Sequence, residues 1–281
     1  MRLGPDDSLT VVDNTPGAEP APPAPGAATV VRAAGRATPA YARNCGAGRC
    51  SAEWLVFLDA DTTPAPDLLD RYFDPPAPEL TALLGGSVID EATRPDDGIA
   101  ARYATLREAS SQDGTYRFGR WGYPKTSNVA VRRSAFEAIG GFREEIRAAE
   151  DADLTYRLRA SGWEVERRDG AAVTHRNRQS VPALLRQRLI HGSGGGWLDG
   201  VYPGAMPARR LPGLTWWALR ATLGGVLAAA RAGDGDAAVL ALLGPLDDVC
   251  FELGRSIPNR RPLGGLAAIR WRPWTARASR S

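Results

Sequence analysis

The sequence predicts an α/β fold with a mostly parallel central sheet, followed by a helical C-terminal segment. Short apolar runs such as Trp54–Leu58 alternate with helical patterns such as Asp151–Ala160. This alternation is typical of a sheet that is covered by helices. The last third of the chain changes to two long apolar stretches. We therefore expect an α/β domain over residues 1–205 and a helical extension over residues 206–281.

Strands are expected where branched and aromatic residues gather between turn signals. In chain order these runs are Leu9–Val12, Thr29–Arg32, Trp54–Leu58, Leu83–Ile89, Asn128–Val131, Trp163–Arg167 and Ala172–His175. The stretch Pro16–Ala28 separates the first two and is rich in Pro, Ala and Gly, which indicates an irregular loop.

Helices are expected where a start signal precedes a helical pattern. Proline fits the first helical turn, so Pro39–Cys45 and Pro66–Phe73 read as short helices. Ser134 is the expected cap of a third helix, which ends at two glycines. Asp151–Ala160 is a fourth, closed by Gly162. The segment between residues 97 and 120 is less regular, although it contains one stretch of helical spacing.

The two C-terminal apolar stretches, Leu214–Ala230 and Ala237–Leu246, are too short or too interrupted for membrane spans, which need about 20 apolar residues. One interpretation is a pair of packed helices. The other is a hairpin on a membrane surface, with Trp216 and Trp217 at the interface. Nearby arginines would then face lipid phosphates, namely Arg209, Arg210, Arg260 and Arg261.

Composition excludes several classes of protein. The formal net charge of +3 is too small to indicate a nucleic-acid-binding protein. Three cysteines, Cys45, Cys50 and Cys250, form neither a disulfide framework nor a zinc spacing. A reducing, cytoplasmic setting fits them best. The first residues, Met1–Asp7, lack the apolar core of a signal peptide.

A buried strand, Trp54–Leu58, ends in Asp59-Ala60-Asp61. Unpaired carboxylates are too costly to bury, so these two must face a cleft at the carboxyl end of the sheet. Such oxygen ligands suit Mg²⁺ or Mn²⁺ together with phosphate groups. The pattern favours a phosphorylated ligand with a divalent cation, although an aspartate after a strand also serves as a helix cap or in a turn.

A second acidic cluster, Glu150-Asp151-Ala152-Asp153, begins the fourth helix. Acids at a helix start complement the helix dipole. Three acids in four residues are more than capping requires. A carboxylate at this position can also act as a general base toward a hydroxyl group if its pocket is desolvated.

Six segments together resemble family 2 inverting glycosyltransferases, which use the nucleotide-sugar-binding, Rossmann-like GT-A fold. The resemblance rests on their order and spacing over residues 9–200. The segments are Val11–Asn14, Ala42–Gly46, Trp54–Asp61, Thr126–Arg133, Ile139–Phe142 and Glu150–Leu158. It implies a hexosyltransferase-type enzyme that transfers a sugar from a nucleotide-sugar donor to an acceptor hydroxyl.

The resemblance implies a donor side built from both halves of the domain. Asp13 would contact the nucleoside, and Arg43 and Asn44 would position the nucleotide. Asp59 would hold the ribose or a metal-bound water, and Asp61 would bind the metal on the diphosphate.

His175 falls where some members place a residue near the metal, so the implied metal set is Asp59, Asp61 and His175. A histidine at a strand end that bonds to the backbone fits the position equally well. Arg186 and Arg188 would neutralise the leaving diphosphate, since guanidinium groups suit phosphate oxygens. A solvated basic helix face is the alternative for these two arginines.

The implied acceptor side centres on Asp151 as the base, with Glu150 beside it. Trp121 and Asn128 are the expected acceptor contacts, and Tyr123 is a further candidate platform for a sugar. These aromatic residues fit ordinary packing equally well.

The resemblance also departs from the family pattern, because few residues precede the segment that ends at Asp13. A first strand and helix that members usually have are therefore expected to be missing. This favours an alternative, a degenerate protein that binds sugar nucleotides or acts as a scaffold without catalysis. The expected partners are a nucleotide-sugar donor and a small-molecule, lipid-carrier or glycan acceptor. The expected location is the cytoplasm or the inner face of the plasma membrane.

Overall fold

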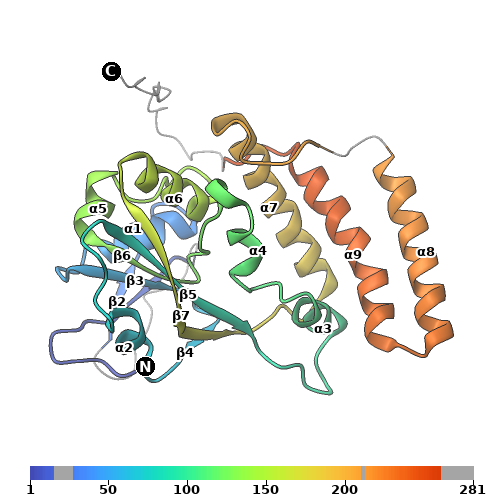
Figure 1. The fold of residues 1–281 in the computed structure, drawn as a ribbon, viewed down its shortest axis with the longest axis horizontal. Coiled ribbons are helices and arrows are strands. Elements are labelled where there is room, and N and C mark those ends of the chain that lie inside the picture. The colour runs from blue at the N-terminus through green and yellow to red at the C-terminus, as the bar shows by residue number, and fades with distance from the viewer. Residues whose placement is uncertain (16–27, 210–212, 261–281) are drawn as a thin grey trace.

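The computed structural model describes residues 1–15, 28–209 and 213–260 (Figure 1). The described chain is an α/β fold with a helical C-terminal part, as predicted. Its strands are β1 (Thr10–Asp13), β2 (Thr29–Arg32), β3 (Trp54–Leu58), β4 (Thr62–Pro64), β5 (Thr81–Asp90), β6 (Asn128–Arg132) and β7 (Glu164–His175). Its larger helices are α1 (Pro39–Ala47), α2 (Leu68–Phe73), α3 (Ile99–Leu106), α5 (Arg133–Ala138), α6 (Glu150–Ala160), α7 (Val181–Val201), α8 (Leu214–Ala232) and α9 (Gly235–Gly254). A short helix α4 (Asp113–Tyr116) and a 3₁₀ turn η1 (Gly119–Trp121) complete the set.

The main sheet has the strand order β3-β6-β5-β7-β4 and is mixed rather than mostly parallel. β5 and β7 pair in parallel, whereas β6 lies antiparallel between β3 and β5. β4, which the sequence analysis missed, adds an antiparallel edge to β7. The strands β3, β5 and β7 still run in one direction, so their carboxyl ends meet at one edge. β1 and β2 form a separate parallel pair.

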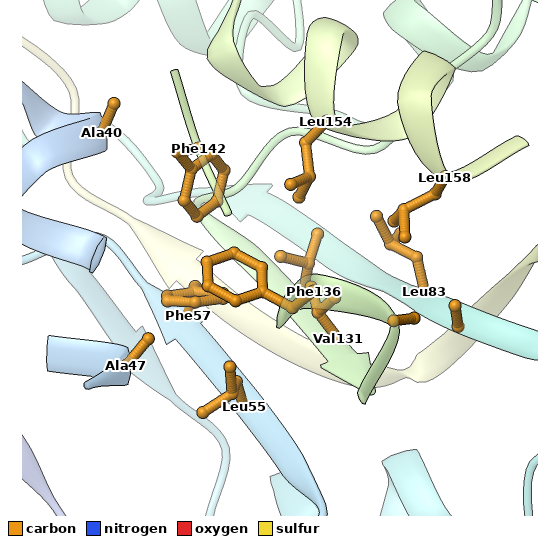
Figure 2. Packing of buried hydrophobic residues seen from close by; sticks show 13 residues of the cluster. Ala40, Ala47, Leu55, Phe57, Leu83, Val131, Phe136, Phe142, Leu154 and Leu158 are labelled. Atoms are coloured by element: carbon orange, nitrogen blue, oxygen red, sulfur yellow. The ribbon is translucent and has the colours of Figure 1, made fainter. Parts of the chain in front are cut away.

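Alternating side chains of β3 divide the core into two layers, because successive residues of a strand face opposite sides. Leu55 and Phe57 point to the layer that α1, α5 and α6 cover. Figure 2 shows Phe57, Phe136 and Phe142 meeting there, with ring centroids 5.3–5.6 Å apart. The other face carries a second cluster, in which Leu68 and Tyr72 of α2 are fully buried.

Two local expectations differ from the structure. The strands expected at 163–167 and 172–175 are one strand, β7, whose register against β5 shifts between Gly86 and Ser87. The bulge accounts for the polar interruption that divides the sequence pattern. Ser134 is not a cap, because α5 begins one residue earlier and Arg132 occupies the capping position without a side-chain bond.

The helix α7 was not predicted, and it organises the C-terminal part. It packs along α9, which also contacts α3, whereas α8 packs on α9 at the edge of the molecule (Figure 1). Among the described residues, no helix is both long and apolar enough to cross a membrane. The predicted boundary between residues 205 and 206 stays a prediction.

Candidate active site

Arg43 joins the two acidic clusters predicted from the sequence. Its guanidinium donates one hydrogen bond to Asp59 Oδ1 at 2.6 Å and another to Glu150 Oε1 at 2.8 Å. Asp59 follows β3 and Glu150 opens α6, so α1 supplies the cation that holds the ends of two other elements together. Arg43 and Glu150 are both largely buried, and a charge-assisted pair of this kind is strongly directional.

The aromatic core fixes the position of Arg43. Its guanidinium lies over the ring of Phe142 at 5.6 Å from the centroid, and Phe142 packs against Phe57 of β3. Asn44 makes two hydrogen bonds to the backbone of Phe142. Its amide nitrogen donates to Phe142 O at 2.9 Å, and its amide oxygen accepts from Phe142 N at 3.0 Å. It also donates to Glu144 Oε1 at 2.9 Å. These hydrogen bonds occupy the amide of Asn44 within this loop, and a role of Asn44 in positioning the nucleotide stays a prediction.

Asp61 and His175 form the second part of the site. Asp61 lies in the turn between β3 and β4, and His175 is the last residue of β7. Asp61 Oδ1 is 3.5 Å from His175 Nε2. The hydrogen bond between them lowers the pKa of Asp61 and raises the pKa of His175. Ser110 Oγ lies 2.9 Å from the other ring nitrogen, His175 Nδ1, and fixes the ring orientation.

These two side chains fit a divalent cation that a nucleotide would share. The Asp61 side chain is 49% exposed, so its carboxylate is open to a ligand. Mg²⁺ at nucleotide sites takes one or two protein carboxylates and completes its shell with phosphates and water; Mn²⁺ also accepts imidazole. The predicted three-residue set is not assembled, because Asp59 turns to Arg43. Within the described ranges, no three His, Cys, Asp or Glu side chains form a group that could hold a metal ion.

Asp151 has the environment of a base rather than of a helix cap. Desolvation and the neighbouring Glu150 charge raise its pKa to about 7, although Ala152 N–H, Arg43 and Lys125 act in the opposite direction. The residue as a whole is half-buried, and its carboxylate accepts a hydrogen bond of 2.8 Å from Ala152 N. A carboxyl group with a pKa near neutrality can accept a proton at physiological pH.

Lys125, which the sequence analysis did not single out, lies close enough to Asp151 for the charge of that carboxylate to affect its pKa. Its ammonium donates to Ala109 O at 2.9 Å and to Ser111 O at 2.8 Å. Burial lowers its pKa to about 8, whereas Asp151 and Asp90 act to raise it. The available signal was that Lys125 is the single lysine in a chain that otherwise uses arginine.

Aromatic residues line the neighbouring region, where α6 and the end of α7 meet η1. The ring of Trp121 packs edge-on against Tyr156 at 4.9 Å, and Tyr156 also contacts Tyr123 and Tyr202. The indole N–H of Trp121 is buried and has no hydrogen-bond partner among the described residues. An acceptor contact by Trp121 stays a prediction.

Asn128 does not contact the acceptor, contrary to the prediction. Its side chain is fully buried and donates to Ser87 O at 2.9 Å and Ala171 O at 2.8 Å, while Tyr72 O–H donates to it at 2.7 Å. All of its polar atoms are used in joining β6 to β5, β7 and α2. It is a structural residue of the sheet.

The remaining predicted donor residues are Asp13, Arg186 and Arg188. Asp13 ends β1, where the backbone N–H of Thr15 and the Arg32 side chain lower its pKa. Arg188 lies 2.8 Å from Asp247 of α9, which gives it a structural partner. Arg186 is exposed on α7. Contacts of these residues with a nucleotide or diphosphate stay predictions.

Residues 54–240 match the family described as "Glycosyl transferase family group 2". The chain is 27% identical over 162 residues to the "Pre-mycofactocin glycosyltransferase" of Mycobacterium tuberculosis, covering 55% of this chain and 33% of that protein. It is 30% identical over 123 residues to the "Glycosyltransferase AglE" of Haloferax volcanii, covering 43% and 39%. A solved structure of a mannosyltransferase from Pyrobaculum calidifontis, in complex with GDP-Man and Mn²⁺, aligns with a TM-score of 0.46 at 18% identity, covering 82% of this chain and 68% of that one.

The aligned regions span between a third and two fifths of the length of these two curated relatives. The family match extends from β3, which carries the first acidic pair, into α9. It therefore includes both acidic clusters and covers more than half of the chain. The chain belongs to family group 2 of the glycosyl transferases.

Proposed function

We propose that the protein transfers a hexose from a nucleotide-sugar donor to an acceptor hydroxyl with inversion at the anomeric carbon, in a reaction that depends on Mg²⁺ or Mn²⁺. One observation carries this proposal: Arg43 bonds both to Asp59 and to Glu150. It brings the donor-side acids and the acceptor-side acids to one place.

The donor side holds and orients the diphosphate. Asp61 and His175 would hold the divalent cation, which supplies electrostatic stabilisation of the charge that develops on the leaving diphosphate. Asp59 is held by Arg43 at a fixed position, so its free oxygen is available to a ribose hydroxyl or a bound water. Arg186 and Arg188 are the candidates for further charge stabilisation of the leaving group.

The acceptor side removes one proton. Asp151 accepts the proton of the acceptor hydroxyl while that oxygen forms a bond to the anomeric carbon. The bond from this carbon to the phosphate oxygen breaks, and its electron pair leaves with the nucleoside diphosphate. Attack opposite the leaving group inverts the anomeric centre. The raised pKa of Asp151 supports this assignment, because proton transfer is most efficient when the base titrates near the working pH.

We propose a small-molecule, lipid-carrier or glycan acceptor and a location in the cytoplasm or at the inner face of the plasma membrane. The aromatic cluster around Trp121 and Tyr123 supports a sugar-containing acceptor, since aromatic rings offer flat apolar faces with polar edges.

Release of nucleoside diphosphate from a panel of UDP- and GDP-sugars, with Mn²⁺ present, tests the proposal. The wild type should turn over at least one donor, and Asp61→Ala should reduce that rate by about 100-fold or more, as expected for loss of a group that stabilises the leaving charge. Asp70→Ala, which removes a carboxylate whose side chain is 72% exposed, is the matched control and should retain the rate. Donor binding without any release by the wild type would instead support the non-catalytic alternative.

A further inference from the structure

The outer face of α8 has no partner among the described residues. Of the 19 residues of α8, three are buried, Leu214, Ala218 and Ala229. The helix packs on α9 at the edge of the molecule, far from the main sheet (Figure 1). A helix with one partner needs one apolar stripe, so additional apolar surface on α8 calls for another explanation.

That additional surface is large and continuous along the helix. Trp216, Leu223 and Leu227 are 62%, 63% and 52% exposed, and their spacing, with Leu219 between them, places them along one side of α8. Trp217 is also exposed. We name this set, Trp216, Trp217, Leu219, Leu223 and Leu227, the α8 face. Exposed apolar patches of this extent mark interaction surfaces.

The charge of the other residues of α8 indicates which partner the α8 face fits. α8 contains Arg220 and Arg231 and no acidic residue, and both arginines are exposed. Among the described residues, neither of these two arginines takes part in an ion pair.

Three of the four acidic residues of α9 are paired with arginines that lie outside α8, one of them being Asp236 with Arg102; Asp248 is the fourth, and no ion pair is found for it among the described residues. Asp247 of α9 is buried against Arg188 and Arg107, and Glu252 lies against Arg255 and Arg209. Both carboxylates are thus neutralised within the molecule.

We propose that the α8 face docks on an anionic phospholipid surface. The leucines would enter the boundary between headgroups and acyl chains, the two tryptophans would lie at the interface, and the two arginines would meet lipid phosphates. A second copy of this chain fits less well, since a two-fold contact through this face would bring arginine-bearing helices together without acids between them. The inference does not depend on the sugar-transfer chemistry.

Co-sedimentation with vesicles tests the proposal on the full chain. The wild type should pellet with vesicles that contain phosphatidylglycerol and remain in the supernatant with pure phosphatidylcholine vesicles. The double variant Leu223→Glu/Leu227→Glu should reduce the bound fraction by at least tenfold. Both leucines are exposed, so the variant should keep the circular dichroism spectrum and thermal midpoint of the wild type.

Leu80→Glu is the matched control, because Leu80 is 59% exposed but lies before β5, and it should bind vesicles as the wild type does. Equal binding by the double variant would overturn the proposal, as would failure of the wild type to bind anionic vesicles. A wild-type dimer in light scattering that the double variant converts to a monomer, without vesicle binding, would assign the α8 face to a second copy instead. Because donor turnover is not measured, failure here leaves the proposed reaction standing.

Discussion

At the scale of single residues, the site depends on two carboxyl groups whose surroundings shift their pKa values in opposite directions. His175 lowers the pKa of Asp61, whereas burial and Glu150 raise the pKa of Asp151. Two acids whose environments separate their pKa values can take different tasks, one remaining charged and one exchanging a proton. The sequence placed both acids correctly at element ends, but it could not supply this difference, because burial is set by residues from other parts of the chain.

The first prediction concerns the pH dependence of transfer. Protonated Asp151 cannot accept the acceptor proton, so kcat/KM should fall about tenfold per pH unit below about pH 7. Rate profiles from pH 5 to 9 with saturating Mn²⁺ measure it. In Asp151→Asn the residual rate should be about 10²–10⁴-fold lower and should no longer follow this titration. A wild-type profile that stays flat down to pH 5 would contradict the assignment of Asp151 as the base.

The second prediction concerns stability. Because its folded pKa is raised, Asp151 holds a proton in the native state between its usual value and about pH 7, where the unfolded chain does not. Its contribution to the free energy of unfolding therefore declines as the pH rises through this window. Asp151→Asn should raise the free energy of unfolding by about 1–3 kcal/mol at pH 8 and by clearly less at pH 5, where more than half of this window has yet to be crossed. Urea denaturation at both pH values measures the difference.

Asp153→Asn is the contrasting variant. Asp153 is fully buried and pairs with Arg143 and Arg157, so its neutralisation should destabilise the protein at pH 8. Stabilisation by both variants would show that the effect is not specific to Asp151.

At the scale of elements, the contacts between helices show what sequence patterns could and could not predict. The helices α1, α6, α8 and α9 were predicted, because the amphipathic or apolar patterns that indicate them lie within each helix. α7 was not predicted, and it contains Gly192 and Gly194–Gly196, although glycine is a poor helix former. In the structure Gly192 and Gly195 face α9, Gly196 faces the residue that follows α9, and Gly194 faces the segment before α6. A Cβ on Gly192 would stand 2.1 Å from the carbonyl oxygen of Phe251, so the glycine is required by a partner distant in sequence.

The third prediction tests this close approach. Gly192→Ala should destabilise the protein by about 1–3 kcal/mol, because the added methyl group forces the backbones of α7 and α9 apart. Gly200→Ala in the same helix meets no atom within 4 Å and should be neutral or stabilise by up to about 1 kcal/mol. Thermal denaturation of the two variants measures the contrast. Equal effects at both positions would show that helix propensity alone decides them.

A fourth prediction concerns the ion pair between Arg43 of α1 and Glu150 of α6. Arg43→Met leaves the largely buried Glu150 without its cation and should cost about 3–5 kcal/mol, as breaking buried pairs does. Adding Glu150→Gln should recover part of this loss, because the uncompensated charge is then removed. If the double variant is no more stable than Arg43→Met, then Glu150 is not the group that Arg43 compensates.

At the scale of the whole molecule, the sheet brings together acids that are far apart in the chain. The α/β class, the family and the two acidic clusters follow from the sequence, because each rests on residues close together. The antiparallel insertion of β6, the burial of Asn128 and the Arg43 bridge do not, because each depends on which strands and helices become neighbours. Asn128 is an example. A polar residue at the start of a strand suggests a binding site, but the amide of Asn128 forms hydrogen bonds with backbone carbonyls of the sheet itself.

The central claim is that both acidic clusters serve one cation-bound donor. An experimental structure with Mn²⁺ and a nucleoside diphosphate tests it most directly, since the anomalous signal locates the metal without assumptions. The account predicts a peak within about 2.0–2.5 Å of an Asp61 oxygen, as expected for such ligands, with the terminal phosphate on the side that Asp151 faces. A metal and diphosphate bound at a site that contacts neither Asp61 nor Asp151 would contradict it.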